Sequence, residues 1–332
     1  TRPEWIKIKP VCQELKRRAI PFRVIFTGQH KDLISSDDLS QLGATSLIKL
    51  KQREKHKKQN RLDEMVSCIL SEETHITDLS ALMVQGDTTS AFSMALASFH
   101  NQVPVIHLEA GLRTYDLQQP FPEEANRQMI SAIASLHLCP TELSKENLIK
   151  EGKHLQSKVV VTGNTALDNI RDVQTTTEKK VLVTMHRREN HKNMKEWFTN
   201  IDFLAQTHWQ YEFLIPLHPN PNVVKYKKVL NNVKIVPSMP HDELIKYLSS
   251  CDYVITDSGG IQEEASFLKK PCMVCRKETE RTEGLGNFSI LCQKPELVND
   301  KYDLLDKLEM SGPCPYGNGN AAEKVVEEIE KF

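Results

Sequence analysis

Short apolar runs alternate along the chain with longer segments in which apolar residues recur every three or four positions. This alternation is typical of a parallel β-sheet whose strands are joined by helices. The apolar runs predict strands at Phe22–Thr27, Ala81–Val84, Val103–Leu108, Val159–Thr162, Val181–Thr184, Tyr211–Leu217, Val233–Val236, Tyr253–Thr256 and Cys272–Cys275. We therefore predict an α/β fold.

The predicted strands form two series, and the polar residues 171–180 lie between them. A chain of 332 residues is long for one hydrophobic core and suits two domains of about 150 residues each. We therefore expect two α/β domains, linked through this polar stretch, with a cleft between them.

Composition and charge exclude several classes of protein. The chain is 39% hydrophobic and 26% charged, with no apolar stretch near the ~20 residues that a membrane span needs. Its net charge of −1 gives no general attraction to nucleic acid or to an anionic membrane. The basic stretch Lys49–Lys58 has no interleaved aromatic residues, which favours a solvated helix face over a nucleic-acid site. We expect a soluble globular protein with neither kind of partner.

The eight cysteines are scattered, and several lie beside apolar residues. This usage is typical of reduced thiols inside a cell, so we expect a cytoplasmic protein. Cys272 and Cys275 form a Cys-x-x-Cys pair inside an apolar run, without the second pair of a zinc site, which favours buried strand cysteines. The chain starts at Thr1 without a signal-peptide pattern, and we expect it to begin inside a longer natural sequence.

Polar residues directly follow several of the predicted strands. In an open parallel sheet, ligands bind beyond the carboxyl ends of the strands. These ends carry Asp87, Glu109, His186, His218 and the stretch Asp257-Ser258-Gly259-Gly260. We expect these groups to face one cleft.

The stretch after Thr256 is a candidate phosphate site. Gly259 and Gly260 let the backbone approach a ligand, and the N-terminus of the following helix favours an anion. A plain capping box, with Ser258 answered by Gln262 or Glu263, is the alternative. The sequence has no GxGxxG or GxxxxGK motif, so nicotinamide and ATP chemistry lack a sequence signature.

The other candidates also have structural alternatives. Asp87 could cap a helix over residues 90–99, and Glu109 could pair with Arg113. Glu123 and Glu124 follow a proline at a helix start, where acidic residues are favourable in any case. His186 and His218 could be hydrogen-bonded core histidines, although Arg187 and Arg188 beside His186 suit a phosphate better. No set of residues has metal-ligand spacing, so we expect no metal.

Several longer motifs occur in a fixed order along nearly the whole chain. They are Thr1-Arg2-Pro3-Glu4 with Lys7, Thr27-Gly28-Gln29-His30, Gln85–Thr89, His107–Thr114, Phe121–Arg127, Thr162–Thr165, His186–Asn190, Asp257–Ala265 and Pro315–Ala321. In these motifs the chain resembles the non-hydrolysing UDP-N-acetylglucosamine 2-epimerases. The hydrolysing relatives have Glu-Gly-Gly-Glu where this chain has Glu109-Ala-Gly-Leu-Arg113.

The resemblance implies a glycosyltransferase-B-like fold of two Rossmann-like domains with the active site in the interdomain cleft. Residues 1–170 would be the sugar and acid–base domain, whose first strand is missing from the sequence, and residues 178–312 the UDP-binding domain. Residues 313–332 would form a helix that packs back on the first domain. The resemblance also implies a homodimer and no cofactor.

The implied reaction interconverts UDP-GlcNAc and UDP-ManNAc by elimination of UDP, through 2-acetamidoglucal, and re-addition. Carbon 2 has no neighbouring carbonyl, so inversion needs either transient oxidation or departure of UDP. Acid–base groups must then reach both faces of the sugar. By motif match the catalytic residues are Asp87, Glu109, Glu123 and His186. The substrate-binding residues are Arg2, Lys7, Arg113, His218, Ser258, Gly259, Gly260, Glu264 (for the ribose hydroxyls) and Arg281.

The sequence departs from the family at three places, the first of which is the missing N-terminal strand noted above. Thr279-Glu280-Arg281-Thr282 lacks the family's proline after the arginine, which predicts a looser loop. Leu33–Ser36 stands where many bacterial members have a Met-Leu-Asp-Gln stretch, part of which contacts an activating second UDP-GlcNAc, so allosteric activation by substrate is a hypothesis for this chain. The same chemistry on another UDP-2-acetamido sugar, a glycosyltransferase of the same fold, and a non-enzymatic nucleotide-sugar-binding regulator are the alternatives.

Overall fold

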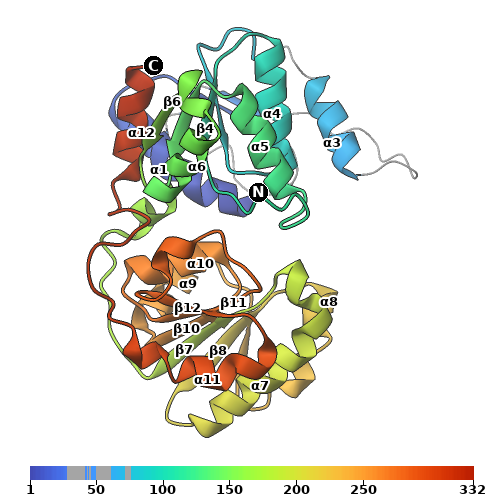
Figure 1. The fold of residues 1–332 in the computed structure, drawn as a ribbon, viewed down its shortest axis with the longest axis vertical. Coiled ribbons are helices and arrows are strands. Elements are labelled where there is room, and N and C mark those ends of the chain that lie inside the picture. The colour runs from blue at the N-terminus through green and yellow to red at the C-terminus, as the bar shows by residue number, and fades with distance from the viewer. Residues whose placement is uncertain (28–41, 43, 45, 50–60, 72–75) are drawn as a thin grey trace. The chain divides into compact units, whose positions relative to one another are not determined.

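The computed structural model describes residues 1–27, 42, 44, 46–49, 61–71 and 76–332 (Figure 1). Three features of the sequence lie outside the described residues: Gly28-Gln29-His30, the stretch Leu33–Ser36, and the basic stretch Lys49–Lys58 after its first residue. The predicted α/β class is confirmed, because all paired strands described are parallel and helices connect them. The chain divides into unit 1, residues 1–169 with 319–332, and unit 2, residues 170–318.

Unit 1 is built on a four-stranded parallel sheet in the order β3-β4-β5-β6. These strands are β3 (Leu82–Gln85), β4 (Val105–Leu108), β5 (Leu136–Cys139) and β6 (Lys158–Val161). A second parallel pair consists of β1 (Arg23–Phe26) and β2 (Ser46–Lys49). The helices are α1 (Arg2–Arg17), α3 (Arg61–Leu70), α4 (Thr89–His100), α5 (Glu123–Ile133), α6 (Glu142–Lys150) and α12 (Ala321–Glu330).

The two faces of the unit 1 sheet are covered by different helices (Figure 1). Side chains alternate across a strand, so Ile106 and Leu108 of β4 pack with α1 and α12. Val105 of the same strand packs with α4 and α5 on the other face. The sheet is therefore buried on both sides, which explains its short apolar runs.

Helix α12 completes unit 1 although it follows unit 2 in the chain. Val325 and Val326 are fully buried in the same cluster as Leu136 and Leu138 of β5. The carboxylate of Asp168 accepts the backbone N–H groups of Ala321 and Ala322 at 3.1 and 2.8 Å. This carboxylate satisfies free donors at the start of α12 and complements the helix dipole.

Unit 2 contains a six-stranded parallel sheet in the order β12-β11-β10-β7-β8-β9. Its strands are β7 (Lys180–Thr184), β8 (Glu212–Leu217), β9 (Lys234–Pro237), β10 (Tyr253–Thr256), β11 (Cys272–Cys275) and β12 (Ser289–Cys292). Its helices are α7 (Met194–Thr207), α8 (Pro221–Val224), α9 (His241–Ser250), α10 (Gly259–Phe267) and α11 (Val298–Tyr302).

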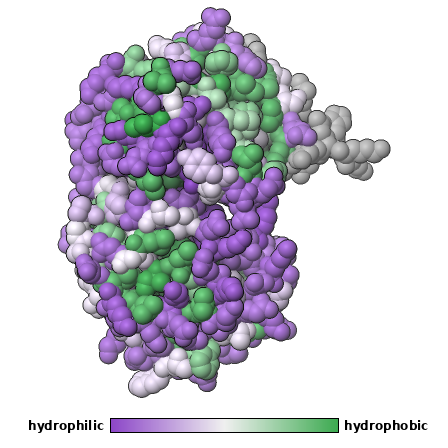
Figure 2. Space-filling model, viewed as in Figure 1, coloured by the Kyte–Doolittle hydropathy of each residue, from purple (hydrophilic) through white to green (hydrophobic). Residues whose placement is uncertain are grey.

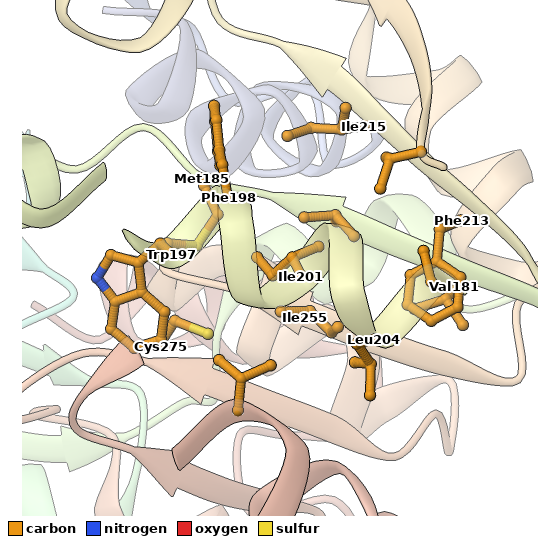
Figure 3. Close-up of a cluster of buried hydrophobic side chains, with 14 of the residues drawn as sticks. Val181, Met185, Trp197, Phe198, Ile201, Leu204, Phe213, Ile215, Ile255 and Cys275 are labelled. Atoms are coloured by element: carbon orange, nitrogen blue, oxygen red, sulfur yellow. The ribbon is translucent and has the colours of Figure 1, made fainter. Parts of the chain in front are cut away.

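The core of unit 2 lies between α7 and the sheet (Figure 3). Trp197, Phe198, Ile201 and Leu204 follow helical spacing, so they form one face of α7, and all are 2% exposed or less. They meet strand residues such as Val181 from the sheet. This packing fixes β7, β8 and β10, whose carboxyl ends carry His186, His218 and the stretch from Asp257 to Gly260.

Among the described strands, the sequence pattern missed β2, β5 and β12. The β5 sequence Leu-His-Leu-Cys contains a histidine and starts shortly after α5 ends, so it does not stand out as a separate apolar run. The Cys-x-x-Cys pair lies on β11, and both residues are fully buried with free thiols. The interpretation as buried strand cysteines is therefore confirmed.

On the face drawn in Figure 2, hydrophilic residues predominate and apolar side chains occur in separate patches. Exposed apolar side chains include Tyr115, Leu117 and Phe121, which belong to the loop before α5. Within the described residues, no helix combines the length and the apolar character needed to cross a membrane.

Candidate active site

Two carboxylates lie at the ends of neighbouring strands in unit 1. Gly86 and Asp87 follow β3, and Glu109 follows β4, which pairs with β3. Gly86 has a φ of +69°, and a Cβ at this position would lie 3.4 Å from the Glu109 Oε2 atom. The positive φ favours glycine at this turn, and the Glu109 carboxylate lies beside it.

The turn after β4 needs unusual backbone conformations. Glu109 has a φ of +66°, a region that non-glycine residues adopt at a cost of about 1–3 kcal/mol. Gly111 has a φ of +87°, and a Cβ there would lie only 2.1 Å from the backbone oxygen of Ser144. Such strain is often retained at functional sites, because it fixes a side chain in place.

Glu109 is held by Lys7 of α1 and by the side-chain amide of Gln85, which contact different oxygens of its carboxylate. The Glu109–Arg113 pair considered above is not the arrangement found, because Arg113 binds Glu151 at 2.7 and 3.0 Å. The Arg113 side chain is fully buried and also donates to Ser131. Burial and these bonds favour a structural role for Arg113 over the contact with substrate that the resemblance implied.

Helix α5 fixes Asp87. Arg127 donates to Asp87 Oδ2 from Nε at 2.8 Å and from Nη2 at 2.7 Å. The Asn126 amide donates to the Asp87 backbone oxygen at 2.8 Å. Asp87 does not cap α4, because Thr88 is the N-cap and accepts the N–H of Ala91. The structural alternative for Asp87 is therefore wrong, and its carboxylate remains a quarter exposed.

Glu123 and Glu124 follow the loop of residues 110–122, and they have different environments. Glu124 is fully buried and accepts the backbone N–H groups of Thr114 and Tyr115, so it holds the loop of residues 110–122 in place. Glu123 is the first residue of α5 and is half-buried. Glu124 is thus structural, and Glu123 remains the candidate acid–base group of this pair.

In unit 2, the turn after β7 wraps around Asp257. The buried Asp257 carboxylate accepts the backbone N–H groups of His186 and Arg187 and the side-chain amide of Asn190, at 2.8–3.1 Å. The His186 and His218 rings stack with centroids 5.4 Å apart. The His186 side chain is 41% exposed and His218 is exposed, so the core-histidine alternative is wrong. Desolvation of the ring and the neighbouring His186 lower the pKa of His218.

The N-terminus of α10 has the geometry of an anion site. Ser258 is the N-cap residue, but its side chain makes no capping hydrogen bond. Gln262 donates to the Arg281 backbone oxygen and Glu263 pairs with Arg281, so the capping-box alternative is wrong. A Cβ on Gly259 would lie 2.5 Å from Arg281 Nη1, which shows how closely the guanidinium approaches the glycine turn.

The loop that carries Arg281 is held by several contacts, although it lacks the family's proline. Arg281 is 6% exposed and binds Glu263 at 2.6 Å and Glu280 at 2.7 Å. Tyr316, from the C-terminal motif, is buried and donates to the Arg281 backbone oxygen at 3.2 Å. These contacts hold Arg281 in this structure, and a looser loop than in the rest of the family stays a prediction.

The remaining predicted residues lie in different settings. Arg2 is exposed on the first residue of α1. Glu264 is buried, with Oε1 2.6 Å from His241 Nε2. Among the described residues there is no group of histidine, cysteine or acidic side chains that could hold a metal ion.

The organising roles of several residues were not identified from the sequence, although Asp257 was among the groups expected to face the cleft. Arg127 and Asp257 lie inside quoted motifs, so their position was a usable signal, but their partners could not be inferred. Arg276, which binds Glu189 and Glu280 at 2.8 Å, had no motif to mark it. These three residues orient the groups that the motifs did identify.

Two buried histidines predict a pH-dependent stability of unit 1. Burial lowers the pKa of His107 to about 4 and that of His137 to about 3, from 6.5. Below pH ~6.5 the unfolded chain binds protons at these residues while the folded chain does not, so stability falls as pH falls. We expect a lower urea midpoint at pH ~5.5 than at pH ~7.5. His137→Gln should weaken this dependence, whereas the same change at exposed His100 should leave it intact.

Comparison with known proteins gives a consistent family. The family model described as UDP-N-acetylglucosamine 2-epimerase matches residues 13–330. The UDP-N-acetylglucosamine 2-epimerase of Neisseria meningitidis is 36% identical, over 100% of this chain and 97% of that protein. The enzyme of the same name from Bacillus subtilis is 34% identical, over 99% of this chain and 93% of that protein.

Comparison with solved structures gives the same family. The Neisseria meningitidis UDP-GlcNAc 2-epimerase bound to UDP-GlcNAc has a TM-score of 0.87 at 34% identity, covering 100% of this chain and 98% of that chain. The Methanocaldococcus jannaschii UDP-GlcNAc 2-epimerase in complex with UDP-GlcNAc and UDP has a TM-score of 0.81 at 28% identity, with the same two coverages.

Proposed function

The chain belongs to the UDP-N-acetylglucosamine 2-epimerase family, and we propose that it interconverts UDP-GlcNAc and UDP-ManNAc by elimination and re-addition of UDP. In the first step the bond between carbon 1 and the diphosphate oxygen breaks and carbon 2 loses its proton. The products are UDP and 2-acetamidoglucal. In the second step a proton returns to the opposite face of carbon 2 while UDP adds again to carbon 1.

Unit 1 supplies the acid–base groups in this proposal. The proton leaves one face of the sugar and returns to the other, so more than one group is needed. Asp87, Glu109 and Glu123 are the candidates. Arg127 holds Asp87 and Lys7 holds Glu109, so both carboxylates have fixed orientations. We assign Lys7 to orienting Glu109.

Unit 2 supplies the groups that stabilise the departing diphosphate. The N-terminus of α10 offers free backbone N–H groups and the positive end of the helix dipole. Arg281 is fixed beside Gly259, and the ring N–H groups of the partly exposed His186 and the exposed His218 belong to the same unit. Fixed donors aimed at developing charge are among the strongest contributions to catalysis. Glu264 is assigned to the ribose hydroxyls.

The observation that carries this proposal is the position of Asp87 and Glu109 at the ends of adjacent strands β3 and β4. Two carboxylates of one reaction must lie within reach of one carbon atom. A Cβ at Gly86, the residue before Asp87, would lie 3.4 Å from the Glu109 Oε2 atom, so the Glu109 carboxylate lies beside the turn that carries Asp87. This closeness favours a shared role in proton transfer at carbon 2.

The proposal is tested by incubating the enzyme with UDP-GlcNAc in heavy water without added nicotinamide. We expect UDP-ManNAc with deuterium at carbon 2, and deuterium in recovered UDP-GlcNAc, because solvent supplies the returning proton. Nuclear magnetic resonance spectroscopy would measure the label. Unlabelled UDP-ManNAc, or product formed only when NAD is added, would contradict the elimination route.

A further inference from the structure

A fully buried histidine contacts the turn that carries Asp87. His107 lies on β4, two residues before Glu109, and is opposite Val84 of β3 in the strand register. Its Nε2 atom lies 2.9 Å from the backbone oxygen of Gly86. A carbonyl oxygen only accepts, so Nε2 carries the proton and donates it. Its Nδ1 atom is buried and has no hydrogen-bond partner in the described part of the chain.

This bond fixes the peptide group that joins Gly86 to Asp87. The Gly86 N–H already donates to the Leu108 backbone oxygen at 2.9 Å. The Gly86 oxygen is bound by His107, so both peptide groups beside Gly86 are tied to β4. Glycine has the widest backbone freedom of any residue, so a turn at glycine benefits most from such ties. Glu109 directly follows the strand that supplies both bonds.

We infer that His107 is a positioning residue, which sets the backbone of Asp87 relative to Glu109 through its hydrogen bond to Gly86. This inference rests on the proposed function, in which these two carboxylates handle the proton at carbon 2. A shift of about 1 Å in a reacting group can lower a rate by up to about 100-fold. The loss of His107 should therefore lower kcat rather than weaken substrate binding.

His137 provides a matched control inside the same sheet. It is the register partner of His107 on β5 and is also fully buried, with the ring centroids 6.3 Å apart. Both of its ring nitrogens lack a hydrogen-bond partner among the described residues. The two histidines therefore share burial and strand environment but differ in the bond to the Asp87 turn.

The experiment compares His107→Leu, His107→Gln and His137→Leu in the full chain. We expect His107→Leu to lower kcat about tenfold with KM within about threefold of the original value. His107→Gln should recover much of kcat, because its Nε2 group can donate from a similar position. His137→Leu should leave kcat within about twofold of the original value, because His137 makes no bond to the Asp87 turn.

Equal kcat values for His107→Leu and His137→Leu at similar stability would overturn the inference, as would a full loss of activity in His107→Gln with normal folding. If His107→Leu does not fold, His107→Asn against His107→Gln decides, because asparagine is too short to place a donor at the Nε2 position. Asp87→Asn separates the two proposals. An active Asp87→Asn enzyme would contradict the proposed role of Asp87, whereas inactive Asp87→Asn with unaffected His107 variants would contradict only the inference.

Discussion

Asp87→Asn is expected to lower kcat by about 100-fold or more, the usual scale for the loss of an acid–base group. Asparagine has the same shape as aspartate but cannot exchange a proton at neutral pH. The backbone of residue 87 would stay in place, because Asn126 binds its oxygen and His107 binds the preceding carbonyl. Initial rates of UDP-ManNAc formation, with deuterium exchange at carbon 2 in the same samples, measure the effect.

Asp116→Asn is the matched control for this variant. Asp116 is exposed on the loop of residues 110–122, where its carboxylate accepts the backbone N–H of Gln118. We expect its kcat within about twofold of the original enzyme. An Asp87→Asn enzyme that works as fast as Asp116→Asn would contradict the acid–base role of Asp87.

Gly259→Ala is expected to weaken UDP binding by about 10- to 100-fold, on the scale of a lost hydrogen bond to a charged group. The new methyl group would meet Arg281 Nη1 at 2.5 Å and Cζ at 2.6 Å, so the guanidinium must move. It cannot move freely, because Glu263 and Glu280 bind it in a buried site. Loss of such a bond costs about 1.5–3 kcal/mol, and each ~1.4 kcal/mol is a factor of about ten in Kd. Isothermal titration with UDP measures the change.

Gly260→Ala is the comparison, because it adds the same methyl group one residue later. Its nearest neighbour would be Ser258 Oγ at 3.9 Å, which is ordinary contact. It reports how much a methyl group alone disturbs a ligand at this helix start. The displacement of Arg281 predicts a larger loss for Gly259→Ala. Equal losses in the two variants would argue against a diphosphate held by Arg281.

The fold class could be predicted from the sequence because a parallel sheet buried on both faces leaves short apolar runs. Tyr253–Thr256 and Cys272–Cys275 have the expected boundaries. Leu136–Cys139 and Ser289–Cys292 were missed, because a polar residue interrupts or opens each run. Such strands are recognised only when neighbouring strands pair with them, and pairing is a tertiary contact.

The candidate groups could be predicted because parallel strands end at a common edge, but their partners could not. Asp87 pairs with Arg127, and Arg113 pairs with Glu151 rather than with nearby Glu109. The predicted pairs between residues close in sequence, such as the capping pair of Ser258 and Gln262, are not found in the structure. Long side chains pair with groups that are close in space, and a single sequence does not show which residues are close in space.

The place of α12 in unit 1 has a consequence for biosynthesis. The ribosome makes this helix only after all of unit 2, yet Val325 and Val326 fill a core shared with Ile106 and Leu136. Apolar surface on β4 and β5 therefore stays uncovered while residues 170–318 are translated. Unit 1 reaches its native packing late, and a nascent chain of this kind is exposed to aggregation during that interval.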